Sequence, residues 1–436
     1  MRGSGSNSSL VRNYNERAVL LHLHHTGTAS KREIADQLQL TPQAMVSIID
    51  RLKKRGLVRS IGKRTGNVGQ PSTLYGINPD GAFSIGVKVG RRHLNMVLAN
   101  FAGEILLRRH NEHAVLEPAC IRHAIPDFCE EVRDRLSPAE WSRLIGLGLS
   151  APYFLNLWNA ELDLPPRTLD VWRDVNLVEQ IAESTGMTVF SENDATAAAI
   201  GEFQFGVGRK YRDFLYIFIG TFVGGGIILD GQPFTGPNGN AGALGPLPVP
   251  PSALDSVSVP AGDGGTALLH RASVSTLLHH LQHHGFAIPT VSDLPRHMDR
   301  VRPLVQEWLE DCSDALVWAI QSLIALLDVE AVIIDGNLAK FLVAEIVDTV
   351  ERRMRRSRQI GVFMPDIALG EVGAEAGAIG AAILPLFARF SPNRAMLTNA
   401  SRGKVYRGFS PSMRGIAESG KPDQRLSKGM SANLSR

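Results

Sequence analysis

Hydrophobic residues near the start of the chain recur at helical spacing, between residues that begin and end helices. An apolar run at residues 20–23 predicts a first helix, which Asn13 or Asn15 could cap and which Thr26-Gly27 would end. Ser30 and Glu33 are spaced as in a capping box, in which each side chain satisfies a free backbone amide of the other. We therefore expect a second helix immediately after Ser30.

A third helix is predicted to begin at Thr41 and Pro42, because threonine is a good N-cap and proline is tolerated at the first helical position. Four apolar residues then follow at intervals of three and four, which turns them toward a small core: Met45, Ile48, Ile49 and Leu52. This arrangement leaves Gln43, Ala44 and Ser47 on the outer side. Small and polar residues on the first turns of a helix suit insertion into the major groove of DNA.

Two short strands, Leu57-Val58 and Leu74-Tyr75, flank a glycine-rich basic segment that has the form of a wing. A helix-turn-helix followed by a basic wing places one helix in the major groove and cations on the phosphate backbone. The residues predicted to contact DNA are Thr41, Gln43, Ala44, Ser47, Lys63, Arg64 and Gln70. The alternative is a winged helix that serves protein contacts and has only solvated charges.

From Phe83 onward, apolar strand-like runs alternate with helical stretches, which is typical of an α/β domain. Residues 84–89 and 94–99 predict an antiparallel hairpin joined by Gly90-Arg91-Arg92. The second half repeats this theme, with a strand pair at 213–219 and 224–229 and helices around 274–284 and 304–327. A last helix at 374–386 consists largely of glycine and alanine, so we expect it to pack closely against another element.

Charge divides the chain into three parts, although the formal total is only +3. Residues 1–76 hold 12 Lys and Arg against 4 Asp and Glu, residues 77–388 hold 24 against 37, and residues 389–436 hold 10 against 2. The basic first part fits a polyanionic partner such as DNA, whereas the acidic body should not bind it. The basic tail lacks apolar periodicity, so we expect it to be disordered.

Cysteine and histidine usage gives no pattern typical of a metal site or a disulfide framework. Cys120, Cys129 and Cys312 form no CxxC pair, which favours a reducing compartment. His279-His280 and His283-His284 place histidines at i, i+4, but no carboxylate or cysteine pattern accompanies them, so we interpret them as a solvated helix face and assign no metal. No apolar run reaches the ~20 residues that span a bilayer, and we expect a cytoplasmic protein with no membrane partner.

Several stretches, in order, give the chain a clear family resemblance. They are 11–15, the helix-turn-helix with Gly56-Leu57-Val58, Gly69-Gln70-Pro71, 191–195, 220–226, 236–242 and 374–382. Together they resemble the transcriptional regulators of the ROK family (repressor, open reading frame, kinase), such as the xylose and N-acetylglucosamine repressors. The resemblance implies a winged helix-turn-helix at 11–78 and a two-lobed actin-like, ribonuclease-H-like α/β domain at 79–388, followed by the tail at 389–436.

The resemblance also implies a sugar site between the lobes. In the family's kinases the aspartate at the position of Asp194 is the general base and the preceding asparagine, here Asn193, binds the sugar. The effector-binding residues implied here are Asn193, Asp194, Asn238 and Gly239. The alternative for Asn193 and Asp194 is that they only cap the helix that follows them.

The sequence departs from the family's kinases at the groups that hold phosphate and metal. Lys88 stands where a kinase has an aspartate, and Arg91-Arg92 replace small residues that let the backbone approach phosphate. Phe222 replaces a usual glycine, so the second phosphate loop is interpreted as a scaffold turn. The family's glutamate, histidine and cysteine-rich zinc loop is replaced by Ala243-Leu244-Gly245-Pro246 and a segment to Gly265 without cysteine or histidine, so no zinc cofactor is expected.

These observations favour a DNA-binding regulator, a repressor of sugar uptake or catabolism genes, with no catalytic residue and Asp194 as a vestigial base. Its expected partners are double-stranded operator DNA, a sugar or sugar phosphate, and further copies of itself in a homodimer or homotetramer, the last inferred from the family and from paired half-sites. Two alternatives remain. One is a sugar kinase with a DNA-binding appendage, and the other is a regulator that has lost its small-molecule input.

Overall fold

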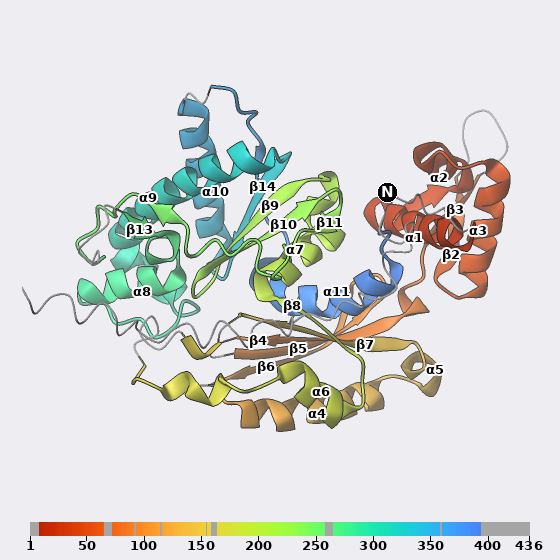
Figure 1. Ribbon diagram of the computed structural model, residues 1–436, viewed down its shortest axis with the longest axis horizontal. Helices are drawn as coiled ribbons and strands as arrows, with labels where there is room; N and C mark the ends of the chain where they lie inside the picture. The colour runs from red at the N-terminus through yellow and green to blue at the C-terminus, as the bar shows by residue number, and fades with distance from the viewer. Residues whose placement is uncertain are drawn as a thin grey trace, which may run out of the picture.

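A computed structural model describes residues 8–64, 72–90, 93–113, 116–153, 155–157, 164–257, 265–357 and 360–393 (Figure 1). Three features singled out from the sequence lie outside these residues: the wing tip with Gln70, the pair Arg91-Arg92, and nearly all of the basic tail. The chain forms three bodies, which are an N-terminal helical domain and two lobes that each contain a five-stranded sheet.

The N-terminal domain has three helices and a small sheet with the strand order β1-β3-β2. Its elements are α1 (Ser8–Thr26), β1 (Thr28–Ser30), α2 (Lys31–Leu38), α3 (Pro42–Lys54), β2 (Val58–Arg64) and β3 (Ser72–Ile77). The local signals explain two helix starts. Ser30 and Glu33 form the expected capping box, and the Thr41 side chain accepts from the amide of Ala44 with Pro42 as the first helical residue.

One local expectation for this domain is wrong, and one strand was not predicted. Asn13 and Asn15 do not cap α1 but lie inside it, because residues 8–13 contain no helix breaker and the helix continues back to Ser8. The strand β1 had no sequence signal of its own. It is three residues long and exists because it pairs with β3, which is a long-range contact.

The two lobes repeat one sheet topology. The first sheet has the order β6-β5-β4-β7-β8 and the second has β11-β10-β9-β14-β15. In each, the first three strands along the chain pair antiparallel and the last two join the sheet in parallel. The first contains β4 (Phe83–Val89), β5 (His93–Asn100), β6 (Ile105–Glu112), β7 (Leu144–Ala151) and β8 (Val189–Asn193). The second contains β9 (Phe214–Ile219), β10 (Val223–Leu229), β11 (Gln232–Pro233), β14 (Ala331–Gly336) and β15 (Asp366–Leu369), and β12 (Pro248–Val249) pairs with β13 (Thr266–Ala267) separately.

Helices cover the outer faces of the two sheets (Figure 1). The first lobe carries α4 (Pro118–Arg135), α5 (Pro138–Trp141) and α6 (Leu177–Thr185), and the second carries α8 (Val274–His283), α9 (Leu294–Leu327) and α10 (Lys340–Arg356). The helix expected from residue 304 begins at Leu294, because α9 continues through Pro303. The doubled strand order and its helices agree with the expected ribonuclease-H-like lobes.

Between the lobes lie α7 (Asp194–Phe205) and α11 (Ala376–Phe390), which pack against each other (Figure 1). The helix α11 also packs against β4 and β7 of the first sheet, whereas α7 packs mainly against β10 of the second. The glycine- and alanine-rich sequence of α11 packs closely, as expected. A Cβ atom added to Gly148 of β7 would lie 1.7 Å from the carbonyl oxygen of Ala381, and one on Gly380 would lie 2.1 Å from that of Ala197. Among the described residues only Gly373–Phe390 is long and apolar enough to cross a membrane, and 67% of this segment is buried inside the protein.

Candidate DNA-binding face and effector cleft

The third helix, α3, presents the predicted recognition residues to solvent. Met45, Ile48, Ile49 and Leu52 are buried, as expected from their spacing. On the opposite side Gln43 and Ser47 are exposed and Ala44 is partly exposed. Thr41 is exposed too, although its hydroxyl is engaged in capping. The residues suited to base contacts therefore share one accessible face.

Ion pairs inside the domain hold several of its cations. Arg51 Nε and Arg55 Nη1 lie 2.6 Å and 2.9 Å from the two carboxylate oxygens of Glu16, whose side chain is only 9% exposed. Arg51 also donates to the hydroxyl of Ser47 at 2.6 Å. These bonds join α3 to α1. The sequence reasoning missed Glu16, because nothing in the local pattern pairs it with residues 35 and 39 positions later.

The two predicted wing cations differ. Arg64 Nη1 lies 2.6 Å from Glu33 Oε1 at the start of α2. Lys63 is exposed and has no ion-pair partner among the residues that the structure describes. Lys53 and Lys54, at the end of α3, are exposed as well. Three lysines are thus available to a phosphate backbone without breaking an internal salt bridge.

The candidate effector cleft is built around the start of α7, where β8 ends. Asn193 caps the helix, since its side-chain oxygen accepts from the amide of Ala195 at 3.1 Å, and Asp194 Oδ1 lies 3.0 Å from the same amide. Asn193 therefore caps the helix. Both side chains remain partly exposed. A helix N-terminus with an amide and a carboxylate is suited to hydroxyl groups or to an anion.

Tyr153 connects this helix end to the loop that carries the other two predicted residues. Its hydroxyl donates to the carbonyl oxygen of Gly239 at 2.8 Å and lies 3.4 Å from Glu192 Oε1. Gly239 adopts φ +77°, which glycine accommodates easily, and Asn238 beside it is exposed. The structure thus brings Asn193, Asp194 and the loop around Gly239 to one place.

Glu192 was not predicted, and its environment differs from that of its neighbours. It is 5% exposed, and burial raises the pKa of its carboxyl group to about 7, against the favourable amide of Asn193. The pKa of Tyr153 is also raised, by burial and by the nearby Glu192. A carboxyl group that is partly protonated near neutrality can donate or accept a hydrogen bond. No sequence signal separated Glu192 from an ordinary surface glutamate.

Comparison with known proteins identifies the family. The profile of the ROK family matches residues 84–386, and that of the MarR family matches residues 13–64. The chain belongs to the ROK family. Its N-terminal domain is a MarR-like winged helix-turn-helix.

Similar ROK proteins include repressors and a regulator of known structure. The chain is 26% identical to the uncharacterized protein y4fQ of Sinorhizobium fredii, over 86% of this chain and 91% of that protein. It is 25% identical to the xylose repressor of Bacillus spizizenii, covering 56% of this chain and 62% of the repressor. It is 26% identical to the transcriptional dual regulator NagC of Escherichia coli, covering 56% and 60%. These two alignments span under two thirds of the repressors' length.

Solved structures agree on the fold. A ROK family transcriptional regulator, described as a homolog of the E. coli MLC protein, superposes with TM-score 0.61 at 19% identity, over 90% of this chain and 98% of that one. A ROK family glucokinase from Streptomyces griseus superposes with TM-score 0.53 at 24% identity, over 70% and 99%. The ROK body therefore has the fold of both regulators and kinases, and the fold alone does not separate the two activities.

In this ROK chain Lys88 lies between the lobes. It comes from β4 of the first lobe, and its Nζ lies 5.2 Å from the ring centroid of Phe218 on β9 of the second. On the facing turn, the carbonyls of Gly220 and Thr221 accept from the first amides of α8 at 2.9 Å and 3.2 Å. This turn is tied to a helix, in agreement with its interpretation as scaffold.

The zinc site implied by the ROK resemblance does not fit the residues present. Ala243 and Pro246 are exposed and have no side-chain donor atom, and residues 243–257 contain neither cysteine nor histidine. We therefore assign no role to zinc at that position.

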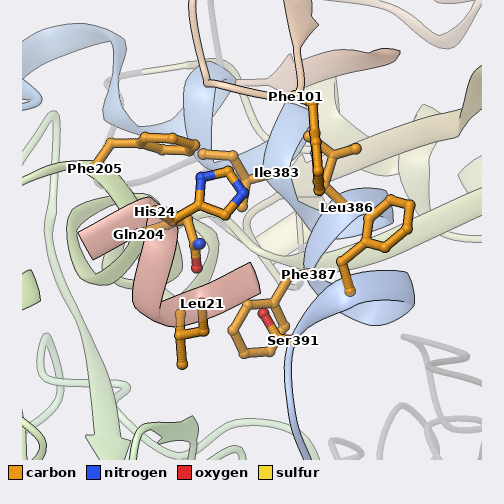
Figure 2. Close-up of a pocket in the computed structure, with 10 residues that line it drawn as sticks. Leu21, His24, Phe101, Gln204, Phe205, Ile383, Leu386, Phe387 and Ser391 are labelled. Carbon is orange, nitrogen blue, oxygen red and sulfur yellow. The ribbon is translucent and has the colours of Figure 1, made fainter. Parts of the chain in front are cut away.

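The winged helix joins the ROK body through α1 (Figure 2). His24 lies between two aromatic rings, with centroid distances of 5.0 Å to Phe101 and 5.9 Å to Phe205, the last residue of α7. His25 contacts Phe203 of the same helix at 5.2 Å. Arg17 donates to the carbonyl oxygens of Ala388 and Ser391 at the end of α11. The DNA-binding domain thus packs against the C-terminal ends of both α7 and α11.

Proposed function

We propose that the protein is a sequence-specific DNA-binding transcriptional regulator, a repressor of carbohydrate uptake or catabolism genes whose DNA binding responds to a sugar or sugar derivative. One observation carries the proposal. The helix α7 begins at the candidate sugar-binding pair Asn193-Asp194 and ends at Phe203 and Phe205, which contact the winged helix. The relatives named as xylose and N-acetylglucosamine repressors support this assignment.

On DNA, α3 enters the major groove. Gln43, Ala44 and Ser47 read base edges from its exposed side, and Thr41 lies at its start. Lys63, Arg64 and Gln70 of the wing contact the phosphate backbone or the minor groove. Lys53 and Lys54 add phosphate contacts at the other end of α3. Operator half-sites are bound in pairs by a homodimer or homotetramer in the cytoplasm.

A sugar hydroxyl binds between Asp194, Asn193 and the loop at Asn238 and Gly239. Closing of the lobes around it displaces the start of α7. Because α7 is a single helix packed on α11, its far end moves with it, and α1 carries the movement to α3 through Glu16 and its two arginines. The sugar then changes DNA affinity by binding one arrangement better than the other.

Footprinting on the DNA upstream of the gene, with and without a panel of sugars, tests the proposal directly. Lys63→Ala should weaken binding to all sequences and reduce the salt slope by about 1, whereas Gln43→Ala should relax sequence preference at a cost of ~1–3 kcal/mol. Lys210→Ala, at an exposed lysine of the body, is the matched control and should bind as wild type. Unchanged DNA binding in both Lys63→Ala and Gln43→Ala would refute the assignment of α3 and the wing to DNA contact.

The effector site is tested by thermal shift with the same sugar panel. Asp194→Asn should abolish the shift that a cognate sugar produces, while Glu183→Gln, at an exposed carboxylate of α6, should keep it. If no sugar shifts the wild-type protein, the regulator has lost its small-molecule input.

The second candidate function is a sugar kinase with a DNA-binding appendage, and Asp194 at the start of α7 favours it. Against it, Lys88 takes the place of a carboxylate, and phosphoryl transfer depends on metal ions positioned by carboxylates. ATP-dependent phosphorylation of any hexose in the presence of magnesium, lost in Asp194→Ala, would establish the kinase. Its failure across the panel leaves the regulator.

A further inference from the structure

A cluster of two histidines and a carboxylate lies in the second lobe. Asp255, His280 and His284 each offer one ligand atom, and these three atoms all lie within 4.8 Å of one another. We propose that Asp255, His280 and His284 form a binding site for a divalent transition metal ion such as Zn²⁺.

The structure supplies what the sequence pattern lacked. His280 and His284 are one helical turn apart at the end of α8, the spacing at which two imidazoles reach one ion. The missing carboxylate comes from Asp255, whose Oδ1 lies 3.4 Å from His284 Nε2. The expectation of a solvated helix face is wrong for His280, whose side chain is only 1% exposed.

The buried histidine is held in place by two neighbours. The hydroxyl of Ser256 lies 2.8 Å from His280 Nδ1, and Glu307 Oε2 of α9 lies 3.3 Å from His280 Nε2. An ion would bind one of these two ring nitrogens in place of its present partner, and the hydrogen bond on the other nitrogen would fix the orientation of the ring. Ser256 directly follows Asp255, so one short segment supplies both a ligand and a partner for another ligand.

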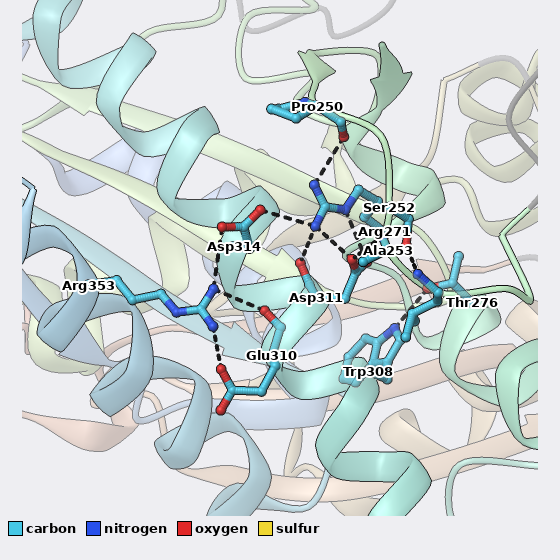
Figure 3. Close-up of polar contacts among 11 residues, drawn as sticks. Pro250, Ser252, Ala253, Arg271, Thr276, Trp308, Glu310, Asp311, Asp314 and Arg353 are labelled. Carbon is cyan, nitrogen blue, oxygen red and sulfur yellow. Dashed lines mark hydrogen bonds and ion pairs between the residues drawn. The ribbon is translucent and has the colours of Figure 1, made fainter. Parts of the chain in front are cut away.

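The segment that carries Asp255 is anchored by a buried ion pair (Figure 3). Arg271 and Asp311 have side chains that are 3% and 4% exposed, with 2.7 Å between Arg271 Nη2 and Asp311 Oδ1. Arg271 also donates to the carbonyl oxygen of Pro250 at 3.0 Å, and Asp311 Oδ1 accepts from the amide of Ala253 at 3.3 Å. Asp255 therefore follows two residues that are fixed to the core.

The helix that carries the histidines is attached to the same scaffold. Trp308 of α9 donates from its indole nitrogen to the hydroxyl of Thr276 on α8 at 3.0 Å (Figure 3). The loop and α8 are both held on α9, so the ligands are brought together before any ion arrives. Preorganised ligands of this kind avoid the ordering cost that weakens accidental surface sites.

Two imidazoles and one carboxylate are ligands typical of zinc and of neighbouring ions such as cobalt and nickel, whereas magnesium and calcium prefer all-oxygen sites. A bound ion would join the loop at 250–257 to the end of α8. These ligands are distinct from Ala243 and Pro246, where the family's zinc would require other residues.

The test uses the untagged full-length chain, stripped with chelator and titrated with Zn²⁺ by calorimetry and with Co²⁺ by visible absorption. Wild type should bind one ion and gain thermal stability. His284→Ala and Asp255→Asn should each weaken binding at least about tenfold and remove the gain, while their metal-free stability stays that of wild type. His279→Ala is the matched control, since it changes an exposed histidine of the same helix outside the cluster and should bind as wild type.

Two results would overturn the proposal. One is a stripped wild-type protein that binds neither Zn²⁺ nor Co²⁺. The other is equal weakening in His279→Ala and His284→Ala, or in neither, because binding would then reflect surface histidines in general. These measurements involve neither DNA nor sugar, so failure of the metal proposal would leave the proposed function untouched.

Discussion

The helix α11 is packed in two contrasting ways along its length. Over most of it, the backbone touches the first sheet and α7 directly: Ser84 and Ser150 donate from their hydroxyls to the carbonyls of Ala382 and Gly377. At its C-terminal end, aromatic rings and a histidine pack around a small pocket that α1 closes (Figure 2). The first contact has no room for an added atom, and the second consists of side chains that can rotate.

This difference indicates which parts of the molecule move together. A seam in which backbones touch cannot slide without clashes, so α7, α11 and the first sheet form one unit. The α1 junction can change by side-chain rearrangement, which is how a small displacement becomes a new domain orientation. The contrast places the adjustable joint between the body and the winged helix.

The largest effect should come from filling the seam. Gly148→Ala would place a methyl group 1.7 Å from the carbonyl oxygen of Ala381, in backbone that cannot rotate away. We expect a loss of about 3 kcal/mol or more in the free energy of unfolding, measured by urea denaturation. Gly62→Ala, where nothing lies within 4 Å of the new atom, should be close to neutral. Equal stability of the two variants would contradict a tight seam.

A smaller effect is expected on the other side of α1, where it meets α3. Glu16→Gln keeps the shape but removes the charge that Arg51 and Arg55 share, and because the arginines are partly exposed we expect a loss of ~2 kcal/mol. Glu351→Gln, which breaks an exposed pair with Arg355, should cost less than about 0.5 kcal/mol. If the two losses measured by urea unfolding are equal, Glu16 is not a structural link.

The junction itself should respond to acid. Burial, with a smaller effect of His25, lowers the pKa of His24 to about 3, and burial with nearby Arg209 lowers that of His25 to about 4. Both are neutral in the folded protein, whereas the unfolded chain takes up protons below about pH 6.5. Stability should therefore be full above pH 6.5 and fall by about 1.4 kcal/mol per pH unit for each histidine as pH decreases toward 4.

Urea unfolding at several pH values measures this slope. His24→Leu should remove the contribution of one histidine to the pH dependence of the free energy of unfolding. His297→Leu, at an exposed position of α9, should leave that pH dependence unchanged. A slope that is the same in all three proteins would mean that the junction opens before the protein unfolds.

The contrast between the two contacts also separates what the sequence could and could not predict. The glycine- and alanine-rich sequence of α11 predicted that this helix packs closely against a neighbour. The capping box at Ser30 and the spacing of Met45 to Leu52 correctly predicted α2 and α3. These signals are local, since neighbouring residues determine them. The same holds for Asn193 and Asp194, whose place at a helix start was read from adjacent residues.

What the sequence could not predict depends on residues that only the fold brings together. His24 meets Phe101 and Phe205 from three separate elements, and Glu16 meets arginines of another helix. Tyr153 and Glu192 of the cleft are of the same kind, as is Asp255 beside the histidines of α8. In each case the residue type is ordinary, and the unusual feature is its burial or its partner.

The smallest predicted effect concerns the polar atom buried at the junction. Gln204 is 6% exposed and lies beside His24 in the pocket, and its Oε1 has no hydrogen-bond partner among the described residues (Figure 2). Gln204→Met has a similar length without this polar group, so we expect a gain of ~1 kcal/mol in urea unfolding. Gln37→Met, at an exposed position of α2, should give no gain. A lower free energy of unfolding in Gln204→Met would mean that the Gln204 amide forms a hydrogen bond in another position of α1. Hydrogen bonding, and not only side-chain packing, would then contribute to rearrangement at the junction.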